Sequence, residues 1–163
     1  MVQDYSFDVR GTDQNNVMRQ APVTLKVVDF GLTPPSPDSV TVAPGSNSAP
    51  VSFQVTAAGS FQDTVNLSCA VPTQLSGVSC SFKVRENDIF VPSKTANPTS
   101  DSPSYVEMTL TAGANQAQAT GTVIIEGTVA NGYNKPQNLT VTIPADYALA
   151  IGNPCLLYTS RCV

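Results

Sequence analysis

The sequence predicts an all-β chain folded as an antiparallel β-sandwich. Short runs alternate apolar and polar residues with a period of two, which is typical of strands that bury one face. No stretch carries the apolar stripe of an amphipathic helix. The apolar members of the runs are Val51, Phe53 and Val55; Val65, Leu67, Cys69 and Val71; Val78, Cys80, Phe82 and Val84; Val106, Met108 and Leu110; Val123 and Ile125; and Leu139, Val141 and Ile143.

Turn signals separate these runs and set the strand lengths. Gly and Asn supply the backbone conformations that tight turns need. The turns are expected at Ala43-Pro44-Gly45, Ala58-Gly59, Ser76-Gly77, Ala112-Gly113 and Asn131-Gly132. The Pro-rich stretches 33–37 and 92–103 predict loops, because proline cannot donate to a central ladder.

Composition narrows the function classes. The chain has 163 residues, of which 41% are hydrophobic and 12% charged, with a net charge of -4. This apolar content favours a globular core over disorder. The absence of a Lys/Arg cluster argues against nucleic acid and against an anionic membrane surface, and no apolar run is long enough to span a membrane.

The residue types also argue against an enzyme. Histidine is absent, which removes the usual general base and the commonest metal ligand. Paired carboxylates remain conceivable among Glu86, Asp88, Asp101 and Glu107, but these lie in or beside a variable loop, where solvated charge is the ordinary state. We therefore predict no catalytic residues, no metal site and no cofactor.

An internal repeat organises the chain. The segment Ser6–Thr12 aligns with Thr122–Thr128 at an offset of 128 − 12 = 116 positions. At the same offset Val23–Val27 falls on Leu139–Ile143 without a gap. One inserted residue later, Asp29-Phe30-Gly31-Leu32 meets Asp146-Tyr147-Ala148-Leu149.

The repeat predicts domain boundaries. Residues 1–28 are expected to be the last two strands of a preceding domain, 29–145 a complete domain, and 146–154 the start of a following one. The strands in 1–28 should then lack their own sheets and dock poorly. The alternative is a single domain with two coincidentally similar hairpins.

The segment 29–143 resembles immunoglobulin-like or fibronectin-III-like tandem repeats of long secreted and surface proteins of environmental bacteria. The stretches that carry the resemblance are DFGL (29–32), DSVTVAPGSN (38–47), FQDTVNLSCAVP (61–72), GVSCSF (77–82) and GTVIIEGT (121–128). It implies an immunoglobulin-like Greek-key sandwich, an extracellular or cell-surface location, and a spacer, adhesion or carbohydrate-facing accessory role. The segment 83–104 departs from the pattern, being richer in charge and proline.

Two cysteines are predicted to form a disulfide. Cys69 and Cys80 both lie on the apolar parity of their strands, so both should point to the core side. Ten residues separate them, enough for a short connection between neighbouring strands. The alternative is a pair of buried free thiols.

Two ligand sites come into consideration. Sugars stack on flat rings, and Tyr133, Tyr105, Tyr5 and Phe90 are the candidate platforms, with Tyr133 beside an expected hairpin tip. Calcium at a domain junction is the other idea, because Asp29 and Asp146 occupy equivalent positions. An oxygen cage needs six to eight ligands, however, and a turn-forming Asp is the simpler interpretation.

The last nine residues, 155–163 (CLLYTSRCV), break the pattern. They can be back-translated to DNA that resembles the transposon mosaic end of a sequencing-library adapter. We interpret them as a non-native tail on a metagenomic sequence, which would exclude Cys155 and Cys162 from any disulfide. The alternative is a genuine C-terminal segment.

Together these observations predict a non-catalytic spacer or adhesion module in a multidomain extracellular bacterial protein. Its expected partners are neighbouring immunoglobulin-like domains and surface glycans or proteins. The alternative is a carbohydrate-binding accessory module of a secreted polysaccharide-degrading enzyme.

Overall fold

The computed structural model describes residues 4–145, and this part of the chain is built almost wholly of β-strands. Its elements are β1 (Tyr5–Thr12), β2 (Met18–Leu25), β3 (Asp29–Leu32), β4 (Ser39–Thr41), β5 (Val51–Ala58), β6 (Val65–Ala70), the 3-10 turn η1 (Thr73–Leu75), β7 (Val78–Glu86), β8 (Ile89–Pro92), β9 (Thr95–Ala96), β10 (Ser104–Ala112), β11 (Ala119–Thr128) and β12 (Asn134–Ile143). Within these residues no helix has the length and apolar character needed to cross a membrane.

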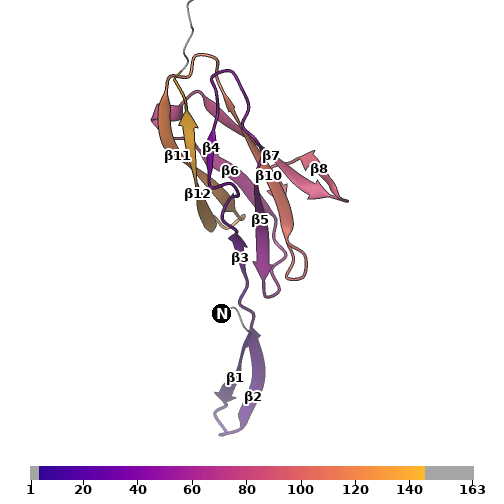
Figure 1. Ribbon diagram of the computed structural model, residues 1–163. Coiled ribbons are helices and arrows are strands. Elements are labelled where there is room, and N and C mark those ends of the chain that lie inside the picture. Colours follow the sequence, from indigo (N-terminus) through magenta and orange to yellow (C-terminus); the bar gives the residue numbers. More distant parts are fainter. Residues whose placement is uncertain (1–3, 146–163) are drawn as a thin grey trace, which may run out of the picture.

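Two five-stranded sheets pack face to face and form the sandwich (Figure 1). Sheet I has the strand order β3-β5-β10-β7-β8, and sheet II has the order β4-β12-β11-β6-β9. The chain repeatedly crosses from one sheet to the other. The predicted immunoglobulin-like sandwich is confirmed. One pairing departs from the antiparallel expectation, because β4 runs parallel to β12 along Ser39–Thr41.

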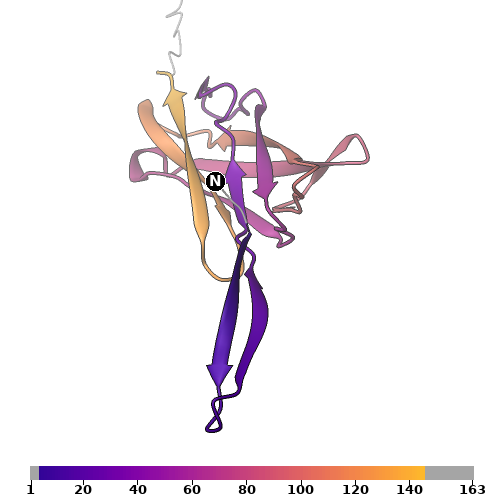
Figure 2. The same ribbon diagram turned by 90° about the horizontal axis from the view of Figure 1, so that it is seen from below.

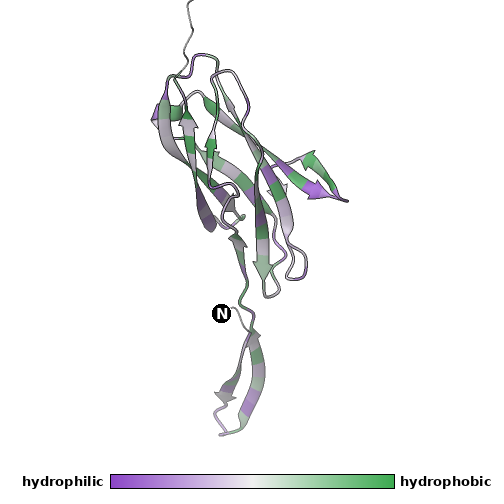
Figure 3. Cartoon of the chain, viewed as in Figure 1, coloured by the Kyte–Doolittle hydropathy of each residue, from purple (hydrophilic) through white to green (hydrophobic). Residues whose placement is uncertain are grey.

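Strand alternation generates a single core between the sheets. One face of each long strand of the sandwich is buried and the other is exposed or half-buried, and Figure 3 shows the resulting bands of opposite hydropathy. The largest side chains that are almost entirely buried are Leu75, Met108, Leu110, Ile125, Leu139 and Ile143. They come from both sheets and from η1, so the core of residues 30–143 is internal to the sandwich.

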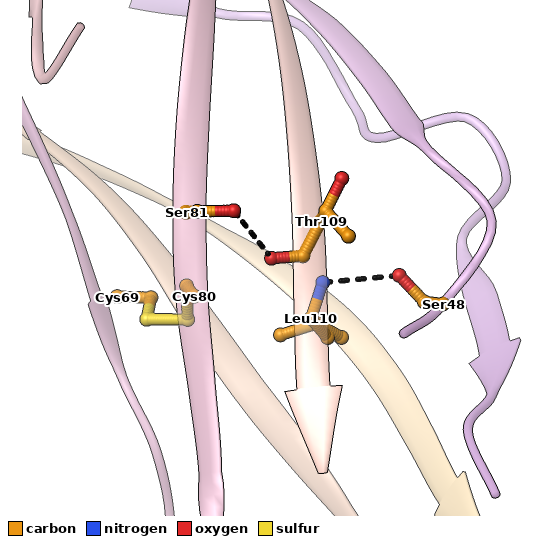
Figure 4. The surroundings of a disulfide bond; sticks show 6 residues. All are labelled: Ser48, Cys69, Cys80, Ser81, Thr109 and Leu110. Carbon is orange, nitrogen blue, oxygen red and sulfur yellow. Dashed lines mark hydrogen bonds between the residues drawn. A yellow bond between two sulfur atoms is a disulfide. The ribbon is translucent and has the colours of Figure 1, made fainter. Parts of the chain in front are cut away.

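The segment before β5 is fixed to the end of β10 by paired hydrogen bonds. Ser48 N donates to Leu110 O at 2.8 Å. Leu110 N donates to the Ser48 hydroxyl at 3.0 Å, and Figure 4 shows this second bond. Ser48 is the one polar residue in the described chain that is buried, and these bonds satisfy it.

The stretch 92–103 was predicted to be a loop, and that prediction was wrong at three residues, of which Pro92 is the last residue of β8. Thr95 and Ala96 form β9, which pairs with Asn66 and Val65 at the edge of sheet II. Ala96 is fully buried there. Strand β9 is too short to show alternation, and its Ser- and Pro-rich flanks conceal it. The predicted loop at 33–37 connects β3 to β4.

The hairpin β1–β2 stands apart from the sandwich (Figures 1 and 2). Its strands pair only with each other, from Tyr5↔Leu25 to Thr12↔Met18. Every residue of both strands is exposed, including the apolar ones. The sandwich therefore buries its core without help from the hairpin.

Candidate functional site

A disulfide joins Cys69 and Cys80, as predicted from their parity (Figure 4). Their Cα atoms are 6.5 Å apart, and both side chains are half-buried against the core. The two strands are consecutive in sequence but lie in opposite sheets, since β6 belongs to sheet II and β7 to sheet I. The bond therefore cross-links the two layers of the sandwich.

The role of this disulfide is structural. It closes a short loop that contains η1, with a sequence separation of 11. In the loop-entropy model, closing a loop of this length stabilises the fold by about 3 kcal/mol. Thiols that form such cross-links are typical of proteins that work in oxidising compartments.

A depression on sheet I lies around Tyr105. A cavity of about 260 Å³ is lined by Pro34, Gln54, Phe90 and Tyr105, together with neighbouring Ser and Thr residues. A second cavity of about 280 Å³ also has Tyr105 in its wall, with Arg85, Asn87 and Asp88. We call these two adjoining cavities the Tyr105 groove.

Strand pairing brings the residues of the groove together. Tyr105 on β10 pairs with Gln54 on β5, and Arg85 on β7 pairs with Phe90 on β8. The Arg85 guanidinium lies 5.5 Å from the centroid of the Tyr105 ring, which links the two pairs into one row across the sheet. Arg85 also donates to the Asp88 carboxylate at 2.6 Å.

The groove combines flat rings with groups that form hydrogen bonds. The Tyr105 side chain is 42% exposed, and Phe90 is half-buried beside the same cavity. An amide at Gln54 and the Arg85–Asp88 ion pair lie along the same row. Such a surface can stack against the apolar face of a polar ring and hydrogen-bond its edge.

Tyr133 is placed differently, although it is exposed to a similar extent. Its ring packs edge-on against Phe30, with centroids 5.8 Å apart, and the Lys135 ammonium lies 5.1 Å from its centroid. The ring thus anchors the β11–β12 turn to the end of the sandwich, and it lines none of the cavities described above.

Asp29 is engaged by the same cluster. Its carboxylate accepts from Lys135 at 3.1 Å and from its own neighbour Phe30 N at 2.8 Å. Hydrogen bonding with Tyr133 and with Asp29 raises the pKa of Lys135 above its ordinary value. The second aspartate of the calcium hypothesis, Asp146, lies outside the described residues.

The other candidate residues do not converge. Tyr5 lies on the exposed hairpin, and Asp88 is engaged by Arg85. In residues 4–145 no three His, Cys, Asp or Glu side chains gather in a way that could hold a metal ion. The groove itself was not predicted, because nothing in the sequence shows that β8 and β10 flank β7. The exposed parity of Tyr105 was the only signal.

Comparison with known proteins adds fold neighbours. No family model matches the chain, and no curated protein matches its sequence. The structure is similar to a family 123 glycoside hydrolase from Clostridium perfringens, with 9% identity, a TM-score of 0.49, and coverage of 73% of this chain and 27% of that one. The chain thus spans about a quarter of the hydrolase.

Two further solved structures show a related fold. One is the BIgI domain of beta protein from S. agalactiae bound to CEACAM1, with 13% identity, a TM-score of 0.38, and coverage of 74% of this chain and 99% of that one. The other is BcpA, the major pilin subunit of Bacillus cereus, with 7% identity, a TM-score of 0.42, and coverage of 84% and 48%. At these identities the likeness concerns the fold alone.

Proposed function

We propose that residues 29–145 are a non-catalytic spacer module of an extracellular, multidomain bacterial protein. The proposal rests on one observation, which is that the chain enters the sandwich at one end and leaves it at the other. Asp29 opens β3 beside the β11–β12 turn, where its carboxylate bonds to Lys135. Ile143 closes β12 at the opposite end of that strand, paired with Ala119 (Figure 1).

This geometry suits a unit in a row of similar domains. The chain traverses the sandwich lengthwise, so a neighbour on each side would continue the line. A ten-residue strand such as β12 spans about 33 Å at about 3.3 Å per residue. Each unit would therefore add about that length, and the inter-sheet disulfide would help it persist outside the cell.

Small-angle scattering on chains with one, two and three copies of residues 29–145 tests the role. We expect the maximum dimension to grow linearly, by about 35 Å per copy, since each copy is a rod of that length. A matched series with Gly/Ser linkers of equal residue number should grow only as the square root of length. If the maximum dimension instead increases as expected for copies packed into a compact cluster, the spacer role is contradicted.

Carbohydrate binding is a second candidate, and the Tyr105 groove is the observation that favours it. Here Tyr105 and Phe90 line one cavity beside the Arg85–Asp88 pair. We propose Tyr105 as the stacking residue, in preference to Tyr133, because Tyr133 is engaged by Phe30 and Lys135.

The two tyrosines provide a matched pair for the experiment. They are 42% and 48% exposed, so truncating either removes a similar amount of accessible ring. In pull-down assays with insoluble polysaccharides, Tyr105→Ala and Phe90→Ala should abolish retention, whereas Tyr133→Ala should leave it intact. Retention that survives Tyr105→Ala, or that the unmodified chain never shows, would exclude the groove as a glycan site.

A further inference from the structure

The hairpin β1–β2 repeats the hairpin β11–β12 in its hydrogen-bond register as well as in its sequence. Tyr5 pairs with Leu25, and Gly121 pairs with Val141; at the other end Thr12 pairs with Met18, and Thr128 with Asn134. Adding 116 to each residue number in the first hairpin gives the paired residues of the second, so the two hairpins have the same strand register. Register decides which face each side chain occupies, and the two hairpins therefore present equivalent faces.

The backbone hydrogen bonds of the two turns correspond. Asp13 N donates to Val17 O at 3.1 Å, and Val129 N donates to Tyr133 O at 3.0 Å. Asn16 N donates to Asp13 O at 3.0 Å, and Gly132 N donates to Val129 O at 2.9 Å. Asn16 and Gly132 both have positive φ, 60° and 86°. The same turn thus closes both hairpins, although its residues differ.

The equivalent apolar faces differ completely in burial. We define the hairpin face as Phe7, Val9, Val23 and Leu25, which are 50%, 52%, 38% and 55% exposed. Their equivalents in the sandwich are Val123, Ile125, Leu139 and Val141, each with 0% exposure. The four exposed apolar side chains on one face of this two-stranded ribbon form a surface on which no second layer of structure is packed.

A glycine gives an independent sign of what the hairpin face is built to meet. A Cβ on Gly127 would lie 2.7 Å from Leu32 Cδ1 and 3.0 Å from Val65 Cγ1, so close packing excludes a side chain there. Its equivalent Gly11 has nothing within 4 Å. A glycine at position 11 leaves room that is required only if a second layer packs against this face of the hairpin.

We propose that the hairpin face is a docking surface for the earlier strands of a second sandwich of this kind, located ahead of the hairpin in the same polypeptide. The order of strands supports that source, because β3–β10 precede β11–β12 in the sandwich that is present. The hairpin would supply the two central strands of the second unit's sheet II, as β12 and β11 do here.

The equivalence specifies the contacts. β11 pairs antiparallel with β6 through residues 124–128, so residues 8–12 of β1 would accept an antiparallel strand. β12 pairs parallel with β4 through residues 140–142, so residues 24–26 would accept a short parallel strand. Side chains equivalent to Leu32 and Val65 would close over Gly11.

An extended chain tests the proposal by supplying those strands. Residues 29–118 are placed directly ahead of residues 3–163, so that residues 3–27 follow them as residues 119–143 do in the native sandwich. Tyr5→Gly is included, because its equivalent Gly121 has Gln74 and Pro72 within 3.1 Å of the Cβ position. Hydrogen exchange should slow at least about 100-fold at the β1–β2 amides, relative to the unextended chain.

Two companion chains make either result decisive. The first is the extended chain in which the hairpin face is replaced by the equivalent residues of the sandwich (Phe7→Val, Val9→Ile, Val23→Leu and Leu25→Val). These substitutions remove any packing mismatch between the added strands and the hairpin. The other places a complete second copy of residues 29–143 ahead of the chain and shows that the added strands fold in this position. Protection of the hairpin in the extended chain, with or without the four substitutions, supports the proposal. Its absence from both, when the complete copy folds, overturns it.

A matched substitution separates docking from nonspecific protection. Gly11→Val should abolish the slowed exchange in the extended chain and leave the unextended chain unchanged. If the unextended chain instead protects the hairpin as it forms dimers at high concentration, the partner is a second copy and the proposal is overturned. These readouts are independent of the scattering series, so the spacer role and the docking surface can fail separately.

Discussion

The hairpins β1–β2 and β11–β12 share a register and a backbone turn, yet one is fully exposed and the other buries one face in the core. Their backbone pairing is therefore a local property of the two strands and the loop between them. Burial is contributed by segments distant in sequence, because β6 and β4 flank β11 and β12 within their sheet and the opposite sheet packs over their apolar face. A hairpin with one apolar face has the apolar–polar alternation of sandwich strands, but it cannot form a sandwich alone.

The largest expected difference between the hairpins is in the cost of removing a facing side chain. Ile125→Ala should destabilise the sandwich by about 2–5 kcal/mol, because it leaves a cavity in a closed core. Its equivalent Val9→Ala should change the free energy of unfolding by less than about 0.5 kcal/mol, since Val9 is 52% exposed. Urea denaturation of both variants measures this, and similar losses would mean that the hairpin is packed.

The disulfide belongs to the sandwich alone. Replacing both Cys69 and Cys80 with Ser should cost about 3 kcal/mol of sandwich stability, because the unfolded chain regains the freedom of the closed loop. The hairpin should be unaffected, as judged by the chemical shifts of its backbone amides. A double variant as stable as the parent under oxidising conditions would contradict the role assigned to the cross-link.

The equivalent glycines should respond unequally to an added side chain. Gly127→Val should cost about 1–3 kcal/mol, because its Cβ would lie within 3.2 Å of Leu32, Val65 and Phe30. Gly11→Val in the unextended chain should be nearly neutral, since its Cβ would meet nothing within 4 Å. Thermal unfolding of the two variants provides the comparison, and equal shifts in Tm would refute it.

The smallest expected effect is at the ion pair near the turn. Lys135→Met should lower stability by about 0.5–1 kcal/mol, because the pair with Asp29 is only partly shielded from solvent. The equivalent Arg19→Met on the exposed hairpin should change nothing measurable.

The pH dependence of Lys135 has a definite sign. The raised pKa means that the ammonium is favoured in the folded state, so its contribution is complete below about pH 10.5 and is lost as the pH rises through the higher folded value. The difference between Lys135→Met and the parent should narrow when urea titrations at pH 7 and pH 11 are compared. A difference that is the same at pH 7 and pH 11 would show that Lys135 acts through packing alone.

Much of this fold could be predicted because alternation and turn residues act locally. The runs at 51–55, 78–84 and 106–110 are strands as expected, and Cys69 and Cys80 are bonded. Parity shows that a side chain points inward, but it does not show from which sheet. The sequence therefore could not reveal that the disulfide joins opposite layers, or that β4 runs parallel to β12.

The candidate groove depends on still less local information. Tyr105 and Phe90 are fifteen positions apart and meet only because β7 lies between their strands. Tyr133 had the more suggestive position beside a turn, yet Phe30 and Lys135, which come from opposite ends of the domain sequence, engage its ring. Contacts of this kind follow from topology, and alternation alone does not specify topology.

Native-state hydrogen exchange on the unextended chain tests the central claim most directly. It compares each amide of β1 with its equivalent 116 positions later in β11, in strands of the same register. We predict that β11 exchanges only through global unfolding of the sandwich, whereas β1 exchanges through local opening and much faster. Equal protection in the two strands, at a concentration where the chain is monomeric, would contradict the account.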